Sequence, residues 1–375
     1  MRLALLHKRL DLNGGTERDL FQTAQGLRDL GHDVHLFCAE FGLEAPQGIT
    51  AHSVPVAPLG RTARMLSLAA RAPLMARRTN SDLVVGFGRF TQQDIIRCGG
   101  GSHRGFLRRM GERGKLRRCW QEISVYHRSL LALEKRQFSA GHYKKIIAVS
   151  AGVKNDLIEN YDVPADRITI LYNGVDADLF HPTKRNTYGA VLRAEFKITD
   201  SAPLVLFVGS GFARKGLDRL LALWQMPKLK DAYLIVVGDD AGMAQYQSRA
   251  QAIAPGRILF AGRRGDIENF YAAADLVALP SVQEAFGNVV LEALASGVPV
   301  VVSGAAGAAE VLEGNLAEGI VEDWNSATEV TRKFADLLAR SRDGELRGAA
   351  RRLAERYSWA KHFQRLDVLL KEVAN

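Results

Sequence analysis

The sequence has 375 residues, of which 47% are hydrophobic and 24% charged, close to the average composition of globular proteins. This composition excludes a largely disordered chain, a collagen-like fibre and an extended coiled coil. The net charge of +9 is uneven, because residues 1–170 hold 26 basic and 16 acidic side chains whereas residues 171–375 hold 24 and 25. The positive first half predicts an anionic partner, either a nucleic acid or a membrane surface.

Cysteines and apolar runs exclude further classes. The three cysteines, Cys38, Cys98 and Cys119, show neither a CxxC motif nor metal-ligand spacing, so neither a disulfide scaffold nor a structural zinc site is predicted. No apolar run reaches the length of about 18 residues needed to span a bilayer. Residues 1–6 read as a strand rather than as a secretory signal. We therefore expect a cytoplasmic protein.

Short apolar runs alternate with longer helical patterns along the whole chain. The runs lie at residues 3–6, 34–38, 83–86, 146–150, 168–171, 204–209, 233–238, 258–262, 276–280 and 298–303. Such runs suit parallel strands that are buried on both faces and joined by helices. The alternation predicts an α/β fold with two doubly wound, Rossmann-like parallel sheets.

A polar stretch interrupts this alternation near the middle of the chain. We predict an N-terminal domain at 1–172, a linker at 173–202, a C-terminal domain at 203–356 and an amphipathic helix at 357–375 that packs back on the N-terminal domain. Ligands of open α/β sheets bind beyond the carboxyl ends of the strands. Two such domains facing each other are therefore expected to form a binding cleft.

The segment from Pro280 to Glu292 is the densest in potential chemistry. A buried strand is predicted to end at Pro280, and a helix is predicted to begin near Gly287. The free amides at the start of a helix suit a diphosphate, and Glu284 and Glu292 could accept hydrogen bonds from hydroxyls of the same ligand. The alternative is an ordinary acidic helix start with a solvated Glu292.

A second motif joins glycines to two cations. Gly209 and Gly211 follow a predicted strand, and Arg214 and Lys215 follow them. Glycines allow close approach of a ligand, and the cations could neutralise a leaving diphosphate. The glycine spacing does not fit a dinucleotide-binding GxGxxG motif. The alternative is a tight turn with two solvated cations.

Two glycine-rich loops lie in the first half. Gly14 and Gly15 precede a helix predicted to start at Thr16, which makes a backbone-amide cradle possible. Residues 99–101 are all glycine and precede His103, which could orient a hydroxyl group. The alternatives are a simple helix-capping turn and a structural histidine.

Residues 104–118 form a basic segment with seven cations and one acid. Its cations are Arg104, Arg108, Arg109, Arg113, Lys115, Arg117 and Arg118. Few aromatic residues are interleaved, which favours an anionic lipid surface or acidic glycolipid over a nucleic acid. The alternative is a solvated loop or helix face.

Five pieces of sequence resemble, in order and spacing, the family-4 retaining glycosyltransferases of the GT-B fold. They are Gly14-Gly15-Thr16-Glu17, Tyr172-Asn173-Gly174-Val175-Asp176, Arg214-Lys215-Gly216, Glu284-x7-Glu292 and Tyr357-Ser358-Trp359. The likeness covers nearly the whole chain and is greatest to enzymes that add glucose to the heptose of lipopolysaccharide core. It implies a nucleotide-sugar donor held mainly by the C-terminal domain and an acceptor held by the N-terminal domain.

The resemblance also implies roles for individual residues. Arg214 and Lys215 would hold the diphosphate, and Glu292 would hold the ribose hydroxyls. Glu284, with the backbone of Phe286, Gly287, Asn288 and Val289, would hold the sugar, and Gly209 and Arg263 would complete the donor site. Gly15 would let the N-terminal domain approach the phosphates, His103 would lie near the reacting sugar and Asp19 near the acceptor. Ser210 stands where many family members carry arginine.

We therefore expect a retaining hexosyltransferase that moves glucose from a UDP-sugar to lipopolysaccharide core at the inner face of the cytoplasmic membrane. No metal ion or other cofactor is expected, because the cations can stabilise the leaving diphosphate and no DxD pair follows a strand. Three alternatives remain open: a mannosyltransferase that uses a GDP-sugar, a basic nucleic-acid-binding protein and a non-catalytic sugar-nucleotide sensor.

Overall fold

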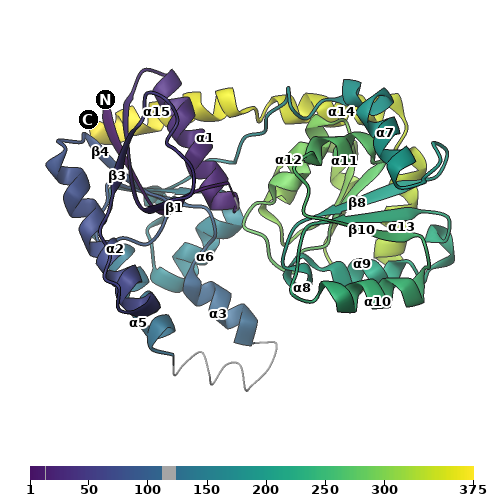
Figure 1. Ribbon diagram of the computed structural model, residues 1–375, viewed down its shortest axis with the longest axis horizontal. Coiled ribbons are helices and arrows are strands. Elements are labelled where there is room, and N and C mark those ends of the chain that lie inside the picture. The colour runs from purple at the N-terminus through teal and green to yellow at the C-terminus, as the bar shows by residue number, and fades with distance from the viewer. Residues whose placement is uncertain (13, 112–123) are drawn as a thin grey trace. The chain divides into compact units, whose positions relative to one another are not determined.

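The computed structural model describes residues 1–12, 14–111 and 124–375, and it divides into two compact units. Unit 1 comprises Met1–Asn173 together with Ala360–Asn375, and unit 2 comprises Gly174–Trp359. Each unit is built on one parallel sheet with helices on both faces (Figure 1). The predicted α/β class with two doubly wound sheets is therefore confirmed.

Unit 1 contains seven described strands in the order β3-β2-β1-β4-β5-β6-β7, and all neighbouring strands are parallel. The strands are β1 (Arg2–Leu10), β2 (Asp33–Phe41), β3 (Thr50–Ser53), β4 (Leu83–Gly86), β5 (Ile95–Cys98), β6 (Lys145–Ala148) and β7 (Ile168–Ile170). The helices are α1 (Gly15–Asp29), α2 (Gly60–Arg78), α3 (His103–Gly111), α5 (Val125–Gln137), α6 (Ala151–Tyr161), the 3-10 helix η1 (Ala165–Arg167) and α15 (Trp359–Ala374). The predicted runs did not include β3, a polar and mostly exposed edge strand, or β5, whose apolar run is interrupted by Arg97.

The central strand β1 shows how this sheet is covered on both faces. Leu3 and Leu5 pack in one cluster with side chains of α1 and α15, whereas Ala4 and Leu6 pack in another with side chains of α2. Successive side chains of a strand point to opposite faces, so a continuous apolar run needs a helical layer on each side. The C-terminal helix α15 supplies part of one layer and belongs to unit 1.

Unit 2 contains six described strands in the order β10-β9-β8-β11-β12-β13, again all parallel. The strands are β8 (Leu204–Val208), β9 (Tyr233–Val237), β10 (Ile258–Gly262), β11 (Leu276–Leu279), β12 (Val300–Ser303) and β13 (Ile320–Val321). The α-helices are α7 (Tyr188–Glu195), α8 (Phe212–Lys215), α9 (Leu217–Leu223), α10 (Met243–Ile253), α11 (Ile267–Ala273), α12 (Asn288–Ala295), α13 (Ala327–Arg340) and α14 (Gly344–Glu355). The 3-10 helices are η2 (Pro182–Asn186), η3 (Pro227–Leu229), η4 (Gly307–Val311) and η5 (Gly314–Gly319). Figure 1 shows α9 and α10 on one face of the sheet and α11 and α12 on the other.

Of the segment predicted as a linker, residues 173–202, Asn173 belongs to unit 1 and residues 174–202 fold as part of unit 2. Asp275, which is fully buried just before β11, explains its attachment. Its carboxylate accepts hydrogen bonds from Arg185 of η2 at 2.5 Å, from Arg193 of α7 at 2.7 Å and from Arg342 at 3.1 Å. Burial alone would raise the pKa of Asp275, but the arginines outweigh it and hold the pKa below its ordinary value.

No helix in the described parts of the chain is both long and apolar enough to cross a membrane.

We predict that Asp275→Ala lowers the free energy of unfolding by about 3–5 kcal/mol, because it leaves the buried Arg193 and the half-buried Arg185 without their counter-charge. Urea unfolding measures this change. The matched variant Glu313→Ala breaks an exposed ion pair with Arg356 and should cost about 1 kcal/mol or less. Equal losses in the two variants would contradict a structural role for the buried cluster.

Candidate functional site

The residues predicted to hold the donor lie beyond the carboxyl ends of the strands of unit 2. Gly209 directly follows β8, Arg263 directly follows β10, and Glu284 lies in the loop between β11 and α12. Because β8 and β11 are neighbours in the sheet, the loops that follow them meet at one edge. Arg263 is exposed on the loop after β10, and no contact of its side chain with another described residue defines a role.

A glycine break places the two cations of this edge. The helical segment after β8 is divided into two helices, since α8 ends at Lys215 and α9 begins at Leu217. Gly216, between them, has a φ of +79°, and a Cβ atom there would collide with the carbonyl oxygen of Pro280. Only glycine tolerates both the left-handed backbone and this approach. The backbone amide of Val282 also donates to the carbonyl of Arg214 at 3.0 Å, which ties α8 to the loop after β11.

Lys215, Arg214 and Glu284 form the charged centre of the edge. The Lys215 ammonium is 2.5 Å and the Arg214 guanidinium 3.1 Å from the same oxygen, Glu284 Oε2. Lys215 is only 9% exposed, and a Cβ atom on Gly209, whose φ is +145°, would lie 3.0 Å from Lys215 Cε. Burial raises the pKa of Glu284, but Lys215 and Arg214 outweigh it and hold the pKa below its usual range.

The second predicted carboxylate lies one turn into α12. That helix begins at Asn288, as predicted, after Gly287, whose φ of +102° needs glycine. Glu292 is half-buried, and its Oε2 accepts a hydrogen bond from the hydroxyl of Tyr271 at 2.5 Å. The backbone amide of Ala308 donates to the carbonyl of Phe286 at 2.8 Å, which fixes the loop before the helix. Val289 is half-buried in the first turn of the helix.

Sequence reasoning missed residues that position this site. Asp240 accepts hydrogen bonds from the backbone amides of Phe212 at 2.8 Å and Gly242 at 2.7 Å. It thereby fixes the start of α8. Tyr271 was missed as well, because its contact with α12 joins residues 21 positions apart and leaves no local pattern. Ser210 Oγ accepts a bond from the backbone amide of Asp239 at 3.3 Å.

In unit 1 the glycine loop after β1 leads into a buried ion pair. Helix α1 begins at Gly15, which has no atom within 4 Å of its Cβ position. Asp19, one turn later, is 5% exposed and accepts a hydrogen bond from Arg97 Nε at 3.1 Å. Arg97 also donates to the side chain of Asn173 at 2.6 Å. In this structure Asp19 is therefore committed to side chains of its own unit.

His103 is the first residue of α3 and is buried. Its backbone amide donates to Glu134 Oε1 at 2.7 Å, and its Nε2 lies 2.9 Å from His127 Nδ1. Burial first, and then the positive charge of Arg89, lower the pKa of His103 to about 4. The imidazole is therefore neutral at physiological pH, so that one ring nitrogen donates a hydrogen bond and the other accepts one.

The basic segment is only partly described. Arg104 donates to the carbonyl of Asn160 at 3.0 Å, and Arg108, which is exposed, lies 3.4 Å from Glu159 Oε2. Both arginines thus contact α6. The side chain of Arg109 and the residues Arg113, Lys115, Arg117 and Arg118 lie outside what the structure describes.

Two family models match the chain, one in each unit. Residues 13–179 match Glycosyltransferase Family 4, and residues 190–356 match Glycosyl transferases group 1. The chain is therefore built from two glycosyltransferase domains, each matched by its own family model. It is 27% identical over 334 residues to the lipopolysaccharide glucosyltransferase WaaG of Escherichia coli K12, across 85% of this chain and 86% of that protein. The family predicted from the sequence motifs is confirmed.

Solved structures show the same fold. The crystal structure of WaaG, a glycosyltransferase involved in lipopolysaccharide biosynthesis, matches 99% of this chain and 98% of its own with a TM-score of 0.77 at 24% identity. The structure of Anabaena HepE in complex with UDP-glucose matches 99% of this chain and 100% of its own with a TM-score of 0.73 at 20% identity. The GT-B fold of this glycosyltransferase is therefore confirmed.

We predict that Gly216→Ala lowers both the stability and the donor affinity of the glycosyltransferase, because the new methyl group pushes α8 and its cations away from Pro280. Gly256→Ala is the matched control, since Gly256 also has a positive φ, +70°, but no atom within 4 Å of its Cβ position. Urea unfolding and calorimetric titration with UDP measure the two effects. A Gly216 variant that matches the Gly256 variant in both measurements would contradict the steric argument.

We predict that Glu284 makes the glycosyltransferase less stable in acid. Its folded-state pKa lies below the ordinary 4.5, so its stabilising contribution is complete above that value and is lost as the pH falls through the lower folded-state pKa. Thermal unfolding followed from about pH 7 to about pH 3 should show a smaller loss of Tm in Glu284→Gln than in the wild type. Glu372→Gln, at an exposed residue of α15, should keep the wild-type loss. A loss of Tm in Glu284→Gln as large as that in the wild type would contradict this prediction.

Proposed function

We propose that this glycosyltransferase moves glucose, or a closely related hexose, from a UDP-sugar to the heptose region of lipopolysaccharide core, with retention and without a metal ion. The observation that carries this proposal is the cluster of Lys215, Arg214 and Glu284 at the carboxyl edge of unit 2. The names of two similar proteins support the choice of substrates: WaaG is a lipopolysaccharide glucosyltransferase, and HepE was crystallised with UDP-glucose.

The cations suit a diphosphate leaving group. When the bond between the sugar and the diphosphate breaks, negative charge develops on the diphosphate oxygens. Lys215, which is buried, and Arg214, which is exposed, can both stabilise this charge, and a preorganised group such as Lys215 contributes most because it is poorly solvated. Two positive charges in place can perform the neutralisation that a divalent ion performs elsewhere, which is why the proposed reaction needs no metal.

The proposed reaction balances without a protein nucleophile. The bond between the sugar C1 and the diphosphate oxygen breaks, and the acceptor hydroxyl oxygen forms the new bond to C1 on the same face. The acceptor proton leaves with the diphosphate. Glu284 would hold sugar hydroxyls, and Glu292, oriented by Tyr271, would hold the ribose.

The remaining site residues take supporting roles in the proposal. Gly209, Arg263 and the backbone of residues 286–289 would line the donor, and Gly15 would leave room for the phosphates. Neutral His103 would orient a hydroxyl group of the reacting sugar, and Asp19 would position the acceptor side through Arg97.

We further propose that the acceptor binds unit 1 while the enzyme lies on the anionic inner face of the cytoplasmic membrane. The support is the charge of unit 1, where residues 1–170 hold 26 basic and 16 acidic side chains. A surface of this sign attracts both anionic lipid and phosphorylated glycolipid. The similar proteins named above are glycosyltransferases, so they give no support to the alternative of a nucleic-acid-binding protein.

The test is turnover of UDP-glucose, UDP-galactose and GDP-mannose on heptose-containing lipopolysaccharide acceptor. We predict that UDP-glucose is the best donor and that Lys215→Ala lowers kcat by about 10²–10³, the usual loss when one preorganised charge-stabilising group is removed. The assay measures released nucleoside diphosphate and the glycosylated product.

Lys230→Ala is the matched control, because Lys230 is an exposed lysine of the same unit, and its kcat should stay within about twofold of the wild type. If the enzyme turns over GDP-mannose faster than UDP-glucose, the proposed donor is wrong. Full turnover by Lys215→Ala would remove the proposed role of this lysine.

A further inference from the structure

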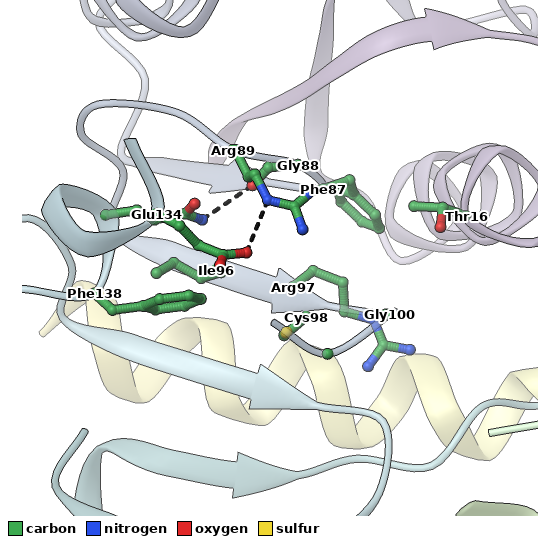
Figure 2. A pocket seen from close by; sticks show the side chains of 13 residues that line it. Thr16, Phe87, Gly88, Arg89, Ile96, Arg97, Cys98, Gly100, Glu134 and Phe138 are labelled. Carbon is green, nitrogen blue, oxygen red and sulfur yellow. Dashed lines mark hydrogen bonds and ion pairs between the residues drawn. The ribbon is translucent and has the colours of Figure 1, made fainter. Parts of the chain in front are cut away.

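Unit 1 holds a cavity of about 150 Å³ at the carboxyl ends of β4 and β5 (Figure 2). A cavity of about this volume accommodates a six-membered ring, and this edge of a parallel sheet is where α/β proteins bind ligands. Its walls come from the loop after β4, from the three glycines at 99–101 after β5 and from α5, with Thr16 of α1 at one side. The reaction proposed above leaves this cavity without a role.

One wall of the cavity carries a buried amide oxygen that needs a donor. Gln137 is 1% exposed, and its Nε2 donates to the carbonyl of Gly88 at 3.0 Å. Its Oε1 has no hydrogen-bond partner among the described residues. A buried acceptor without a partner costs about 1–3 kcal/mol. A ligand hydroxyl that donates to Oε1 would remove this cost.

Another wall carries a guanidinium with donors to spare. Arg89 Nε donates to Glu134 Oε1 at 2.9 Å, as the dashed line in Figure 2 shows. The two terminal nitrogens of Arg89 have no hydrogen-bond partner in the described part of the chain, and the side chain is 34% exposed. An arginine held at Nε in this way presents a preorganised pair of N–H groups, the geometry that matches a phosphate or carboxylate.

The charges around the cavity leave Arg89 as the cation available to a ligand. The Glu134 carboxylate does not depend on Arg89 alone, since it also accepts the backbone amide of His103 at 2.7 Å. Arg97, the other cation that lines the cavity, is already paired with Asp19 at 3.1 Å. An anion that enters the cavity would therefore meet one uncommitted guanidinium edge.

We propose that this cavity binds one anionic sugar unit of the acceptor, a pyranose that carries a phosphate or a carboxylate. The fork of Arg89 pairs with the anionic group, and a ring hydroxyl donates to Gln137 Oε1. The buried aromatic rings of Phe87 and Phe138, which also line the cavity, suit the C–H face of the pyranose. Only the identification of this ligand as part of the acceptor depends on the proposed function.

The glycine loop explains how such a ligand can enter. Gly100 is exposed, and a Cβ atom on it would meet no other atom within 4 Å. A larger side chain at this position therefore projects into free space at the rim of the cavity without disturbing the packing. Gly100→Val should narrow the entrance and leave the pair of Arg89 and Glu134 intact.

The test is calorimetric titration of the full chain, saturated with UDP, with glucose 6-phosphate, glucuronate and glucose. UDP keeps the cations of unit 2 occupied, so that an anionic sugar reports on unit 1. We expect glucose 6-phosphate or glucuronate to bind at least about tenfold more tightly than glucose, the minimum for one charge-assisted bond. If glucose 6-phosphate binds more tightly than glucuronate, the site prefers a phosphate, and the reverse order indicates a carboxylate.

Two variants locate the binding. Arg89→Lys keeps a positive charge beside Glu134 but removes the paired N–H groups of the guanidinium, and Gly100→Val blocks the rim of the cavity. Each variant should weaken binding of the anionic sugar by about tenfold. Lys215→Ala, measured without UDP, should bind the anionic sugar like the wild type. Equal affinity for glucose and both anionic sugars, or loss of binding in Lys215→Ala alone, would overturn the proposal.

The same titrations separate this proposal from the proposed function. UDP binding in the first step of the titration tests the donor site of unit 2. If UDP fails to bind while the Arg89-dependent sugar binding persists, the proposed donor is wrong and the cavity proposal stands. If UDP binds and no anionic sugar does, the cavity proposal is wrong and the donor site stands.

Discussion

Burial of both faces of each parallel sheet is the constraint on which the rest of this structure depends. A strand such as β8 or β11 is apolar along its length because helices cover both sides of it, so polar chemistry is displaced to the ends of the strands. In unit 2 this edge holds Lys215 and Glu284. In unit 1 it holds Arg97 and the cavity with Arg89. In both units the polar groups therefore lie at the carboxyl ends of the strands, but the groups themselves differ.

Opposite charges within each edge hold its functional groups in place. Glu284 pairs with two cations of unit 2, and Glu134 holds Arg89 and the start of α3 in unit 1. In both cases a carboxylate that is mostly buried orients a long basic side chain. Such pairing reduces the entropy that a long cationic side chain loses when a ligand binds, and it makes the position of the charge specific.

The sequence predicted what local pattern can predict. Apolar runs located most strands, and the motifs around Lys215 and Glu284 converge on one edge although they are far apart in the chain. Short or polar strands such as β3 and β13 carry too few apolar residues to be detected. Residues 174–202 resembled a linker because their attachment depends on Asp275, up to 90 positions later. Glu134 and Arg89 were missed for the same reason, since only distant contacts give them a role.

The division of the chain has a consequence for synthesis on the ribosome. Unit 2 is one continuous segment, whereas unit 1 needs Ala360–Asn375, which is made after the whole of unit 2. Side chains of α15 such as Leu366 and Leu370 complete a core that begins with Leu3. Unit 1, which emerges first, therefore waits for α15 to complete its core, while unit 2 can finish folding earlier. Nascent unit 1 exposes an uncovered apolar face throughout this interval, which is when chaperone protection matters most.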